Sequence, residues 1–213
     1  DWGMAAFELG AVPGSSRALV CIGGLTDGLL SMRYLPMLAE AVGKDGWRVV
    51  QPVLASSYSG WGMSSLDSDA SDIDRLLDHL ASRRGVSEVV LLGHSTGCQD
   101  VVRYLAIGKH SSMVRGAILQ APVSDREALP LTHCGSKEAF EESLRKFRDI
   151  ASTMIREGRG NEVMPRSAAD LIGPPHAITA YRFDSLTGRM TDDDMFSSDL
   201  SDDELRETLG HVA

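Results

Sequence analysis

The chain has 213 residues, 43% of them hydrophobic, so it is long enough to bury a core of its own and is predicted to form a single domain over residues 1–213. Its 24% of charged residues, 21 glycines and 8 prolines are close to globular averages and exclude collagen-like and low-complexity chains. The net charge of −9 argues against nucleic-acid binding, and no apolar run reaches the roughly 18 residues that span a bilayer, which argues against membrane insertion.

Five segments have the composition of β-strands, the first weaker than the other four. In chain order they are Ala5–Leu9, Arg17–Ile22, Trp47–Leu54, Ser87–Leu92 and Val114–Gln120. Apolar residues at helical spacing fill the three gaps between the last four strands. This alternation predicts a mainly parallel sheet with helices on both faces, in which function gathers at the carboxyl ends of the strands. The last two strands are continuously apolar, which predicts that both of their faces are covered.

The alternation stops after Gln120. Glu138–Arg156 has the apolar spacing of a long amphipathic helix, and residues 128–190 are expected to form a helical cap insertion, although an ordinary covering helix fits the periodicity equally well. A final helix is predicted to begin near Ser201, because Ser201 and Glu204 form a capping box, and Gly210 is placed to end it.

The segment Gly93-His94-Ser95-Thr96-Gly97 matches the pattern Gly-x-Ser-x-Gly. A predicted strand runs directly into it and a predicted helix runs directly out, which is the setting of a nucleophile elbow. The turn is expected to force Ser95 into a strained backbone conformation, and the flanking glycines are expected to avoid collisions that a Cβ would cause. A tight strand-to-helix turn that binds nothing, or a phosphate-binding helix start, remains an alternative.

An exposed Ser95 would lie at the positive end of a helix dipole, where backbone N–H groups can receive developing negative charge. The N–H of Thr96 is the first candidate oxyanion donor. The second is assigned to Leu25, in the small-residue loop that follows Arg17–Ile22. Further candidates for a substrate pocket are Gly24, Tyr58, Trp61 and His94, although for Tyr58 and Trp61 packing under a loop is equally compatible.

Six phrases carry a resemblance to a known family, and they occur in the family's order. They are GGLTDGLL at Gly23, SSYSGWGMSSL at Ser56, LLGHSTGCQDVVRYL at Leu91, ILQAPVSDREA at Ile118, AYRFDSL at Ala180 and FSSDLSDDEL at Phe196. On these residues the chain resembles the α/β-hydrolase superfamily, and within it a little-characterised eukaryotic family that includes the fungal esterase for fusarinine-type siderophores. The resemblance implies the α/β-hydrolase fold and hydrolase chemistry without fixing the substrate.

A serine hydrolase of this fold needs an acid and then a histidine after the serine, and the resemblance implies that both follow the position of Gly210 on two further strands. The chain stops at Ala213 and opens at Asp1 without Met, so we expect a fragment that lacks this base and shows little or no turnover alone. Asp125 is a weaker candidate for the acid, with a helix or turn cap beside Arg126 as the favoured alternative.

The remaining histidines and acidic residues are weaker candidates. Three histidines follow the elbow helix at a distance without a final strand before them: His133, His176 and His211. The other three, His79, His94 and His110, are expected to be surface or packing residues. The triple acid Asp192-Asp193-Asp194 lacks the Gly and distal Glu of a calcium loop and is expected to be a solvated turn. The sequence therefore implies no metal ion and no organic cofactor.

Only three cysteines occur, namely Cys21, Cys98 and Cys134. Their odd number and spacing argue against a disulfide framework or a zinc site, so a reducing, cytoplasmic location is expected, and Cys98 is expected to be a buried apolar residue. The leading hypothesis is an esterase in which Ser95 attacks a small-molecule ester and forms an acyl-enzyme. The alternative is a noncatalytic α/β-hydrolase-fold binding protein, or an inactive fragment.

Overall fold

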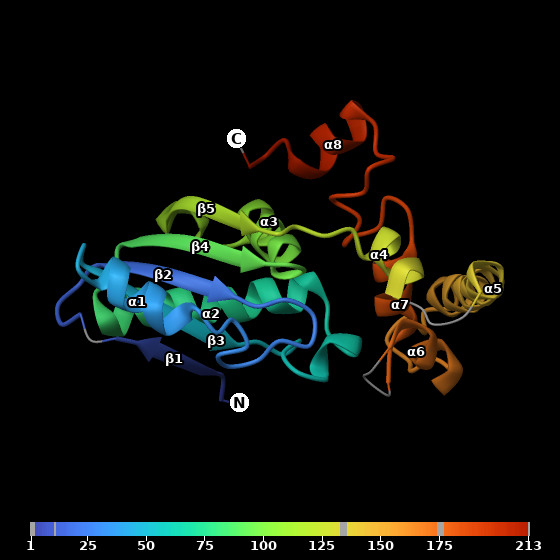
Figure 1. Cartoon of the computed structure of the whole chain (residues 1–213), viewed down its shortest axis with the longest axis horizontal. Helices are drawn as coiled ribbons and strands as arrows, with labels where there is room; N and C mark the ends of the chain where they lie inside the picture. Colours follow the sequence, from blue (N-terminus) through green and yellow to red (C-terminus); the bar gives the residue numbers. More distant parts are fainter. Residues whose placement is uncertain (1–2, 11, 133–135, 174–176, 213) are drawn as a thin grey trace. The chain divides into compact units, whose positions relative to one another are not determined.

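The computed structural model describes residues 3–10, 12–132, 136–173 and 177–212 (Figure 1). Contacts along the chain divide it into two compact units. The first consists of Asp1–Tyr58 and Leu66–Pro122, and the second of Ser59–Ser65 and Val123–His211. No helix among the residues that the structure describes has the length and apolarity needed to cross a membrane.

The first unit is built on a five-stranded sheet with the strand order β1-β3-β2-β4-β5. The strands are β1 (Ala5–Leu9), β2 (Arg17–Ile22), β3 (Trp47–Val53), β4 (Glu88–His94) and β5 (Val114–Gln120). β1 runs antiparallel to β3, and the other pairs are parallel. All five predicted strands are therefore confirmed, with end points that agree within two residues.

Three helices cover the sheet, and their residues alternate with the strands as predicted. They are α1 (Leu35–Gly43), α2 (Leu66–Arg84) and α3 (Gly97–Ile107), with a short 3-10 helix, η2 (Ser111–Met113), before β5. Along β2, Ala18, Val20 and Ile22 belong to a core shared with α2 and α3, whereas Leu19 and Cys21 belong to a core shared with α1. Successive side chains of a strand point to opposite faces, so helices cover both faces of the sheet.

Strand β5 differs from the prediction that both of its faces are covered. Ile118 is 48% exposed, and every β5 residue is exposed or half-buried, whereas Leu91 on the neighbouring β4 is fully buried. Within the described ranges β5 pairs only with β4, so it forms an edge of the sheet. A continuous apolar run indicates a strand, but it carries no information on which strand ends at an edge.

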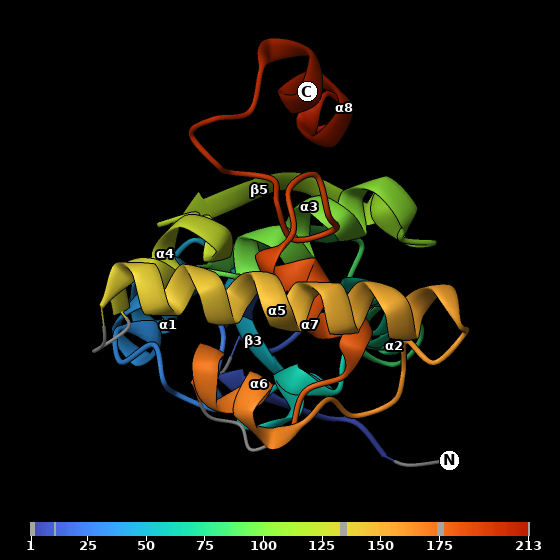
Figure 2. The ribbon, with the colours of Figure 1, turned by 90° about the vertical axis from the view of Figure 1, so that its right-hand side faces the viewer.

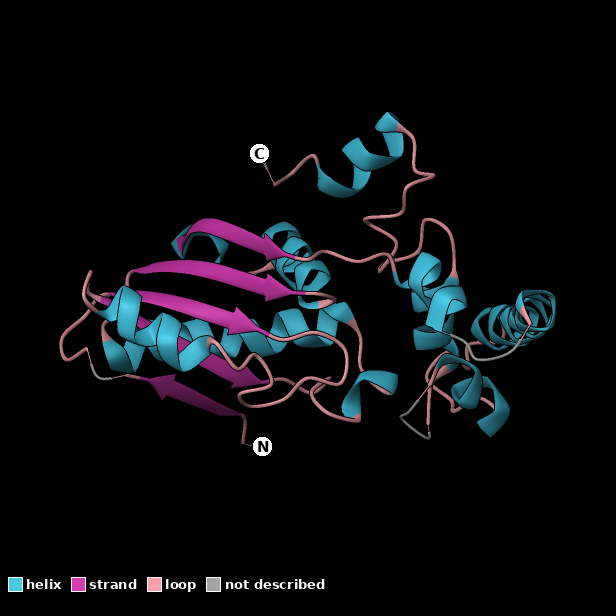
Figure 3. Cartoon of the chain, in the orientation of Figure 1, coloured by secondary structure: helices cyan, strands magenta, loops and turns pink. Residues whose placement is uncertain are grey.

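The second unit consists of helices and loops, while the strands of Figure 3 gather in the first unit. Its elements are η1 (Gly60–Gly62), α4 (Asp125–Thr132), α5 (Lys137–Arg156), α6 (Arg166–Ile172), α7 (Ala180–Thr187) and α8 (Asp202–Leu209). The predicted cap insertion, residues 128–190, falls inside this unit, and its role as a cap stays a prediction. Helix α5 contacts α7 and α6, and in Figure 2 it crosses in front of α7.

The long helix predicted at Glu138–Arg156 is α5, whose side-chain cap is Ser136, with an oxygen that accepts the Ala139 N–H. Phe147 of α5 meets Phe183 of α7 edge to face, with ring centroids 6.2 Å apart. The capping box of α8 is also confirmed, since Ser201 and Glu204 bond each other's backbone N–H groups. Helices α4, α6 and α7 were not predicted, because each has eight residues or fewer and too few turns to show a clear apolar period.

Of the acidic triple at 192–194, only Asp192 is exposed in a turn as the sequence predicts, and the prediction is wrong for the other two. Asp193 is 1% exposed and Asp194 is 3% exposed. Asp193 pairs with the guanidinium of Arg182, and Asp194 pairs with Arg126, so both buried charges are compensated. The arginines lie 11 and 68 residues away in sequence, which is why a local pattern could not reveal the burial.

Candidate active site at the carboxyl end of β4

Ser95 stands in the turn between β4 and α3, as the elbow prediction requires. Its φ is +53°, in the left-handed region that non-glycine residues rarely adopt, so the predicted backbone strain is confirmed. The Ser95 N–H donates to the carbonyl of Gln120 at 3.0 Å, and the Ser95 carbonyl accepts the N–H of Cys98 at 2.9 Å. These bonds hold the turn against the end of β5, and the Ser95 residue is half-buried.

The two glycines of the motif are required by close backbone contacts. A Cβ on Gly93 would lie 2.3 Å from the carbonyl oxygen of Gly97. A Cβ on Gly97 would lie 2.6 Å from the carbonyl oxygens of both Ile22 and Gly23. These separations are far below van der Waals contact, which confirms the expected reason for glycine on each side of the serine.

The loop after β2 brings its main chain directly against the serine. A Cβ on Gly24 would lie 2.8 Å from the Cβ of Ser95. The Asp27 N–H donates to the Gly24 carbonyl at 3.0 Å, and Thr26 has a φ of +67°, so residues 24–27 form a tight turn. Leu25, the candidate oxyanion residue, is therefore the residue that follows the point of closest approach.

Neither candidate oxyanion amide is used in a protein hydrogen bond: among the residues that the structure describes, the N–H groups of Leu25 and Thr96 donate none. Thr96 is the residue before α3, so its amide also belongs to the positive end of that helix. An unpaired backbone N–H beside a strained serine is the arrangement that oxyanion stabilisation requires.

His94 and Asp27 form a second link between the loop and the elbow. The Asp27 carboxylate accepts the Gly24 N–H at 2.8 Å, and its Oδ2 lies 3.5 Å from Nδ1 of His94. The His94 contact is within ion-pair range but lacks hydrogen-bond geometry, so we treat it as the weaker of the two. Sequence analysis missed Asp27, although Asp is one of the residues that dominate turns.

The two aromatic pocket candidates lie in different units, Tyr58 in the first and Trp61 in the second. Tyr58 is 52% exposed in the first unit, and its ring packs so closely on Gly28 that no Cβ would fit there. Trp61 is buried in η1 of the second unit, where its carbonyl accepts from Nε of Arg182. Trp61 thus packs inside its own unit, and the pocket role of both aromatic residues stays a prediction.

Asp125, the weaker candidate for the acid, is the first residue of α4. The Oγ of Ser124, the residue before this helix, accepts the Glu127 N–H, and the expected capping role of Asp125 stays a prediction. Desolvation of its carboxyl group, followed by repulsion from Asp193, raises the pKa of Asp125 to about 7, and Arg182 partly opposes the shift. Asp125 thus belongs to a charged cluster within the second unit.

The other side chains singled out by the sequence have simpler surroundings. Cys98 is fully buried, its S–H donates to the Gly93 carbonyl, and burial raises the pKa of its thiol to about 11, so it is not a nucleophile. His79 lies on α2, His110 precedes η2, and His211 follows α8. The predictions for His133, Cys134 and His176 fall outside the described residues. Across the described ranges, His, Cys, Asp and Glu side chains form no group of three that could hold a metal ion.

Comparisons with known proteins identify a family and several relatives of this chain. The family described as "Protein of unknown function (DUF1749)" matches residues 3–213. The chain is 34% identical over 232 residues to "Fusarinine C esterase sidJ" of Aspergillus fumigatus, covering 92% of the chain and 66% of that protein. It is 33% identical over 252 residues to "Esterase AN6793" of Emericella nidulans, covering 98% and 67%.

Solved structures agree with these relatives. The "Siderophore hydrolase EstB from Aspergillus fumigatus" superposes with a TM-score of 0.75 at 32% identity, covering 98% of this chain and 70% of that one. The fold is therefore the α/β-hydrolase fold, as the sequence predicted. The chain spans 61–67% of the length of the curated relatives that match it. With nearly all of its length matched, the chain belongs to the DUF1749 family of α/β-hydrolases, whose members include fungal siderophore esterases.

Proposed function

We propose that this chain carries the nucleophile and the oxyanion-binding amides of a serine esterase. The nucleophile is Ser95, and the donors are the N–H groups of Leu25 and Thr96. One observation supports this more than any other: Ser95 has a φ of +53° while the main chain at Gly24 approaches its Cβ so closely that no side chain fits between them. Strain of this kind is kept at functional sites, where it fixes a reacting atom.

In the proposed reaction, Oγ of Ser95 attacks the carbonyl carbon of an ester while a general base takes the hydroxyl proton. The carbonyl oxygen becomes an oxyanion and accepts from the two amides, with the N-terminus of α3 adding a favourable potential. Collapse of the intermediate breaks the bond to the alcohol oxygen, which leaves with the proton. Water then hydrolyses the acyl-enzyme and regenerates Ser95.

The substrate class is supported by the relatives. Two of them are named esterases and one a siderophore hydrolase, so we propose a small-molecule carboxylic ester rather than an amide. Because the fusarinine C esterase and the siderophore hydrolase are each at least 32% identical to this chain, siderophore esters are the first substrates to try. Fold membership by itself does not select among esters.

A fluorophosphonate probe, applied to the protein at its full natural length, tests this proposal. We expect one covalent adduct, located on Ser95 by peptide mass spectrometry, together with turnover of a p-nitrophenyl ester. Ser95→Ala should lose both, whereas Ser87→Ala, which removes an exposed hydroxyl just before β4, should keep both. If Ser95 takes no adduct, or Ser95→Ala hydrolyses esters at the wild-type rate, the enzyme reading fails and the noncatalytic binding protein remains.

A further inference from the structure

The segment that carries the Leu25 amide, Gly23–Leu30, is strained and is held by side chains at both ends. We call it the oxyanion loop. Thr26 and Leu30 have φ values of +67° and +60°. This conformation is unfavourable for any residue with a Cβ, and more so for threonine, whose Cβ is branched. A loop in such a conformation keeps its shape only where surrounding bonds enforce it.

Asp27 holds the first half of the oxyanion loop. Its carboxylate accepts the Gly24 N–H at 2.8 Å, on the residue before the proposed donor. Its own carbonyl accepts the Tyr58 N–H at 2.9 Å, which ties the turn to the segment after β3. A charged acceptor on a backbone N–H is one of the stronger hydrogen bonds in proteins.

Gln51 holds the second half from the neighbouring strand. It lies on β3 between apolar residues and is 2% exposed. Its Oε1 accepts the Leu30 N–H at 2.9 Å, and its Nε2 donates to the Gly28 carbonyl at 3.1 Å. The oxygen and the nitrogen of one buried side-chain amide therefore both bond to the oxyanion loop. They orient the loop in a way that a packed apolar side chain could not.

We propose that Gln51 is a positioning residue for the oxyanion hole, an inference that rests on the function proposed above. Gln51 holds residues 28–30 together with the hydroxyls of Ser31 and Tyr58, which accept the Gly28 and Leu29 N–H groups. Asp27 holds residues 24–27, and Leu25 follows the serine contact at Gly24. Without Gln51, the loop can relax from its strained conformation and carry the Leu25 amide away from the oxyanion. A displacement of about 1 Å at such a site can reduce the rate about a hundredfold.

The test compares Gln51→Met with Gln51→Glu in the full-length protein. Methionine has nearly the same shape and makes neither hydrogen bond, whereas glutamate keeps an oxygen for the Leu30 N–H. We expect Gln51→Met to lower kcat by about tenfold to a hundredfold and to change KM by less than about threefold. The reason is that the Leu25 backbone N–H, which Gln51 positions, acts mainly on the transition state. Gln51→Glu should recover part of the loss, relative to Gln51→Met, where its buried carboxyl is protonated and can also donate to the Gly28 carbonyl.

A second measurement separates positioning from general destabilisation. An aryl trifluoromethyl ketone forms a hemiketal oxyanion on the serine, so its inhibition constant should rise in Gln51→Met by about the same factor as kcat/KM falls. The control Tyr104→Phe also removes a buried side-chain hydrogen bond, to Asp74, and should leave both values unchanged. Hydrogen exchange should become faster in residues 23–30 of Gln51→Met and stay unchanged in α3.

The outcomes distinguish the two proposals. If the wild-type protein takes no adduct on Ser95, the proposed function and the role of Gln51 both fail. If the wild-type protein is active but Gln51→Met keeps its kcat and its affinity for the ketone, only the positioning role fails. A rise in the KM of Gln51→Met with no change in its kcat would also contradict the positioning role. Should Gln51→Met not fold, Asp27→Asn must show the same pattern, with a smaller loss because its amide oxygen can still accept the Gly24 N–H.

Discussion

At the scale of single residues, the contact between Gly24 and Ser95 decides how closely a backbone amide can approach the serine. We predict that Gly24→Ala lowers the rate of fluorophosphonate labelling of Ser95 by about a hundredfold, because the new Cβ, 2.8 Å from the Ser95 Cβ, must push the oxyanion loop away. Gly116→Ala on β5 is the control, since a Cβ there meets nothing within 4 Å. Equal labelling of both variants would mean that the approach at Gly24 has no catalytic role.

Asp125 gives the second unit a dependence on pH. Its pKa in the folded protein is about 7, against 3.8 for an ordinary Asp, so the folded state binds the proton more tightly. The resulting stability is fully present below about pH 4 and is lost as the pH rises to about 7. Three pKa units correspond to at most about 4 kcal/mol.

Asp125→Asn mimics the protonated side chain at every pH, which makes the prediction measurable. We expect the variant and the wild type to have the same free energy of unfolding at pH 4 and the variant to be the more stable at pH 8. Urea unfolding at the two pH values is the measurement, because only the difference between the proteins reports on this carboxyl. A constant difference across the pH range would show that burial does not perturb Asp125.

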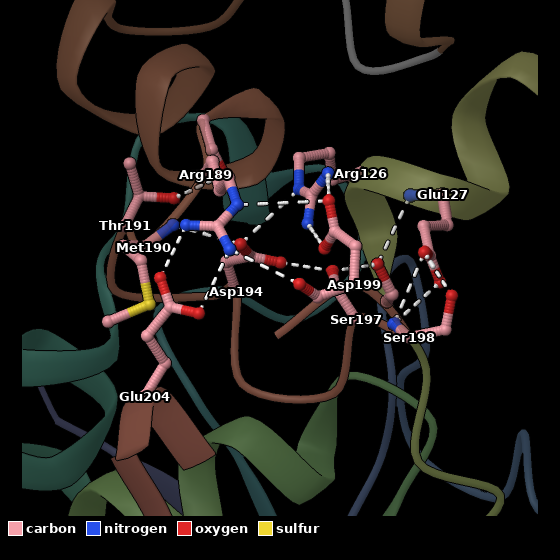
Figure 4. A network of polar contacts seen from close by, with 12 residues as sticks. Arg126, Glu127, Arg189, Met190, Thr191, Asp194, Ser197, Ser198, Asp199 and Glu204 are labelled. Carbon is pink, nitrogen blue, oxygen red and sulfur yellow. Dashed lines mark hydrogen bonds and ion pairs between the residues drawn. The ribbon is translucent and has the colours of Figure 1, made fainter. Parts of the chain in front are cut away.

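At the scale of elements, a polar network joins α4 to the segment that follows α7 (Figure 4). Asp194 is its buried centre: it accepts the Met190 N–H at 2.9 Å, pairs with Nε of Arg126 at 3.3 Å and accepts from Ser197. Asp199 binds the outer side of the same guanidinium and is half exposed. The network therefore contains one buried and one solvated carboxylate on a shared cation.

These two carboxylates should differ strongly in their effect on stability. Asp194→Ala leaves a backbone N–H, a hydroxyl and part of the Arg126 charge without their buried partner, and we expect it to lower the free energy of unfolding by about 3–5 kcal/mol. Asp199→Ala should cause a much smaller loss, because water replaces an exposed partner. Thermal unfolding of both variants tests the ranking, and equal losses would contradict the buried role of Asp194.

At the scale of the whole molecule, the sheet of the first unit has an apolar edge. β5 pairs with β4 on one side only within the described ranges, and Ile118 is 48% exposed. Exposed apolar edge strands promote association between chains, and an inserted lysine is a common natural protection. We predict that these 213 residues self-associate and that Ile118→Lys reduces this association, as measured by light scattering against concentration. The control is Leu131→Lys, on an apolar residue of α4 that is 86% exposed and lies outside the sheet, which should leave the association unchanged.

Most of the fold could be predicted because its signals are local. Each strand of the first unit is a short apolar run, and α5 repeats its apolar face over five turns, so periodicity alone located them. The elbow could be predicted for the same reason, since five consecutive residues specify the turn. The short helices α4, α6 and α7 escaped prediction, and so did the exposure of β5, because neither has a distinct local pattern.

The amino-acid sequence by itself determined the order of strands and helices, the strained turn at Ser95 and the need for glycine on both sides of it, because these depend on neighbours within a few residues. The tertiary structure alone decided which polar groups are buried and what they hold. Gln51 meets Leu30 across 21 residues and Arg126 meets Asp194 across 68, and only the folded chain brings such partners within hydrogen-bond distance. Hydrogen bonds and ion pairs act over a few ångströms of space, whatever the separation along the chain.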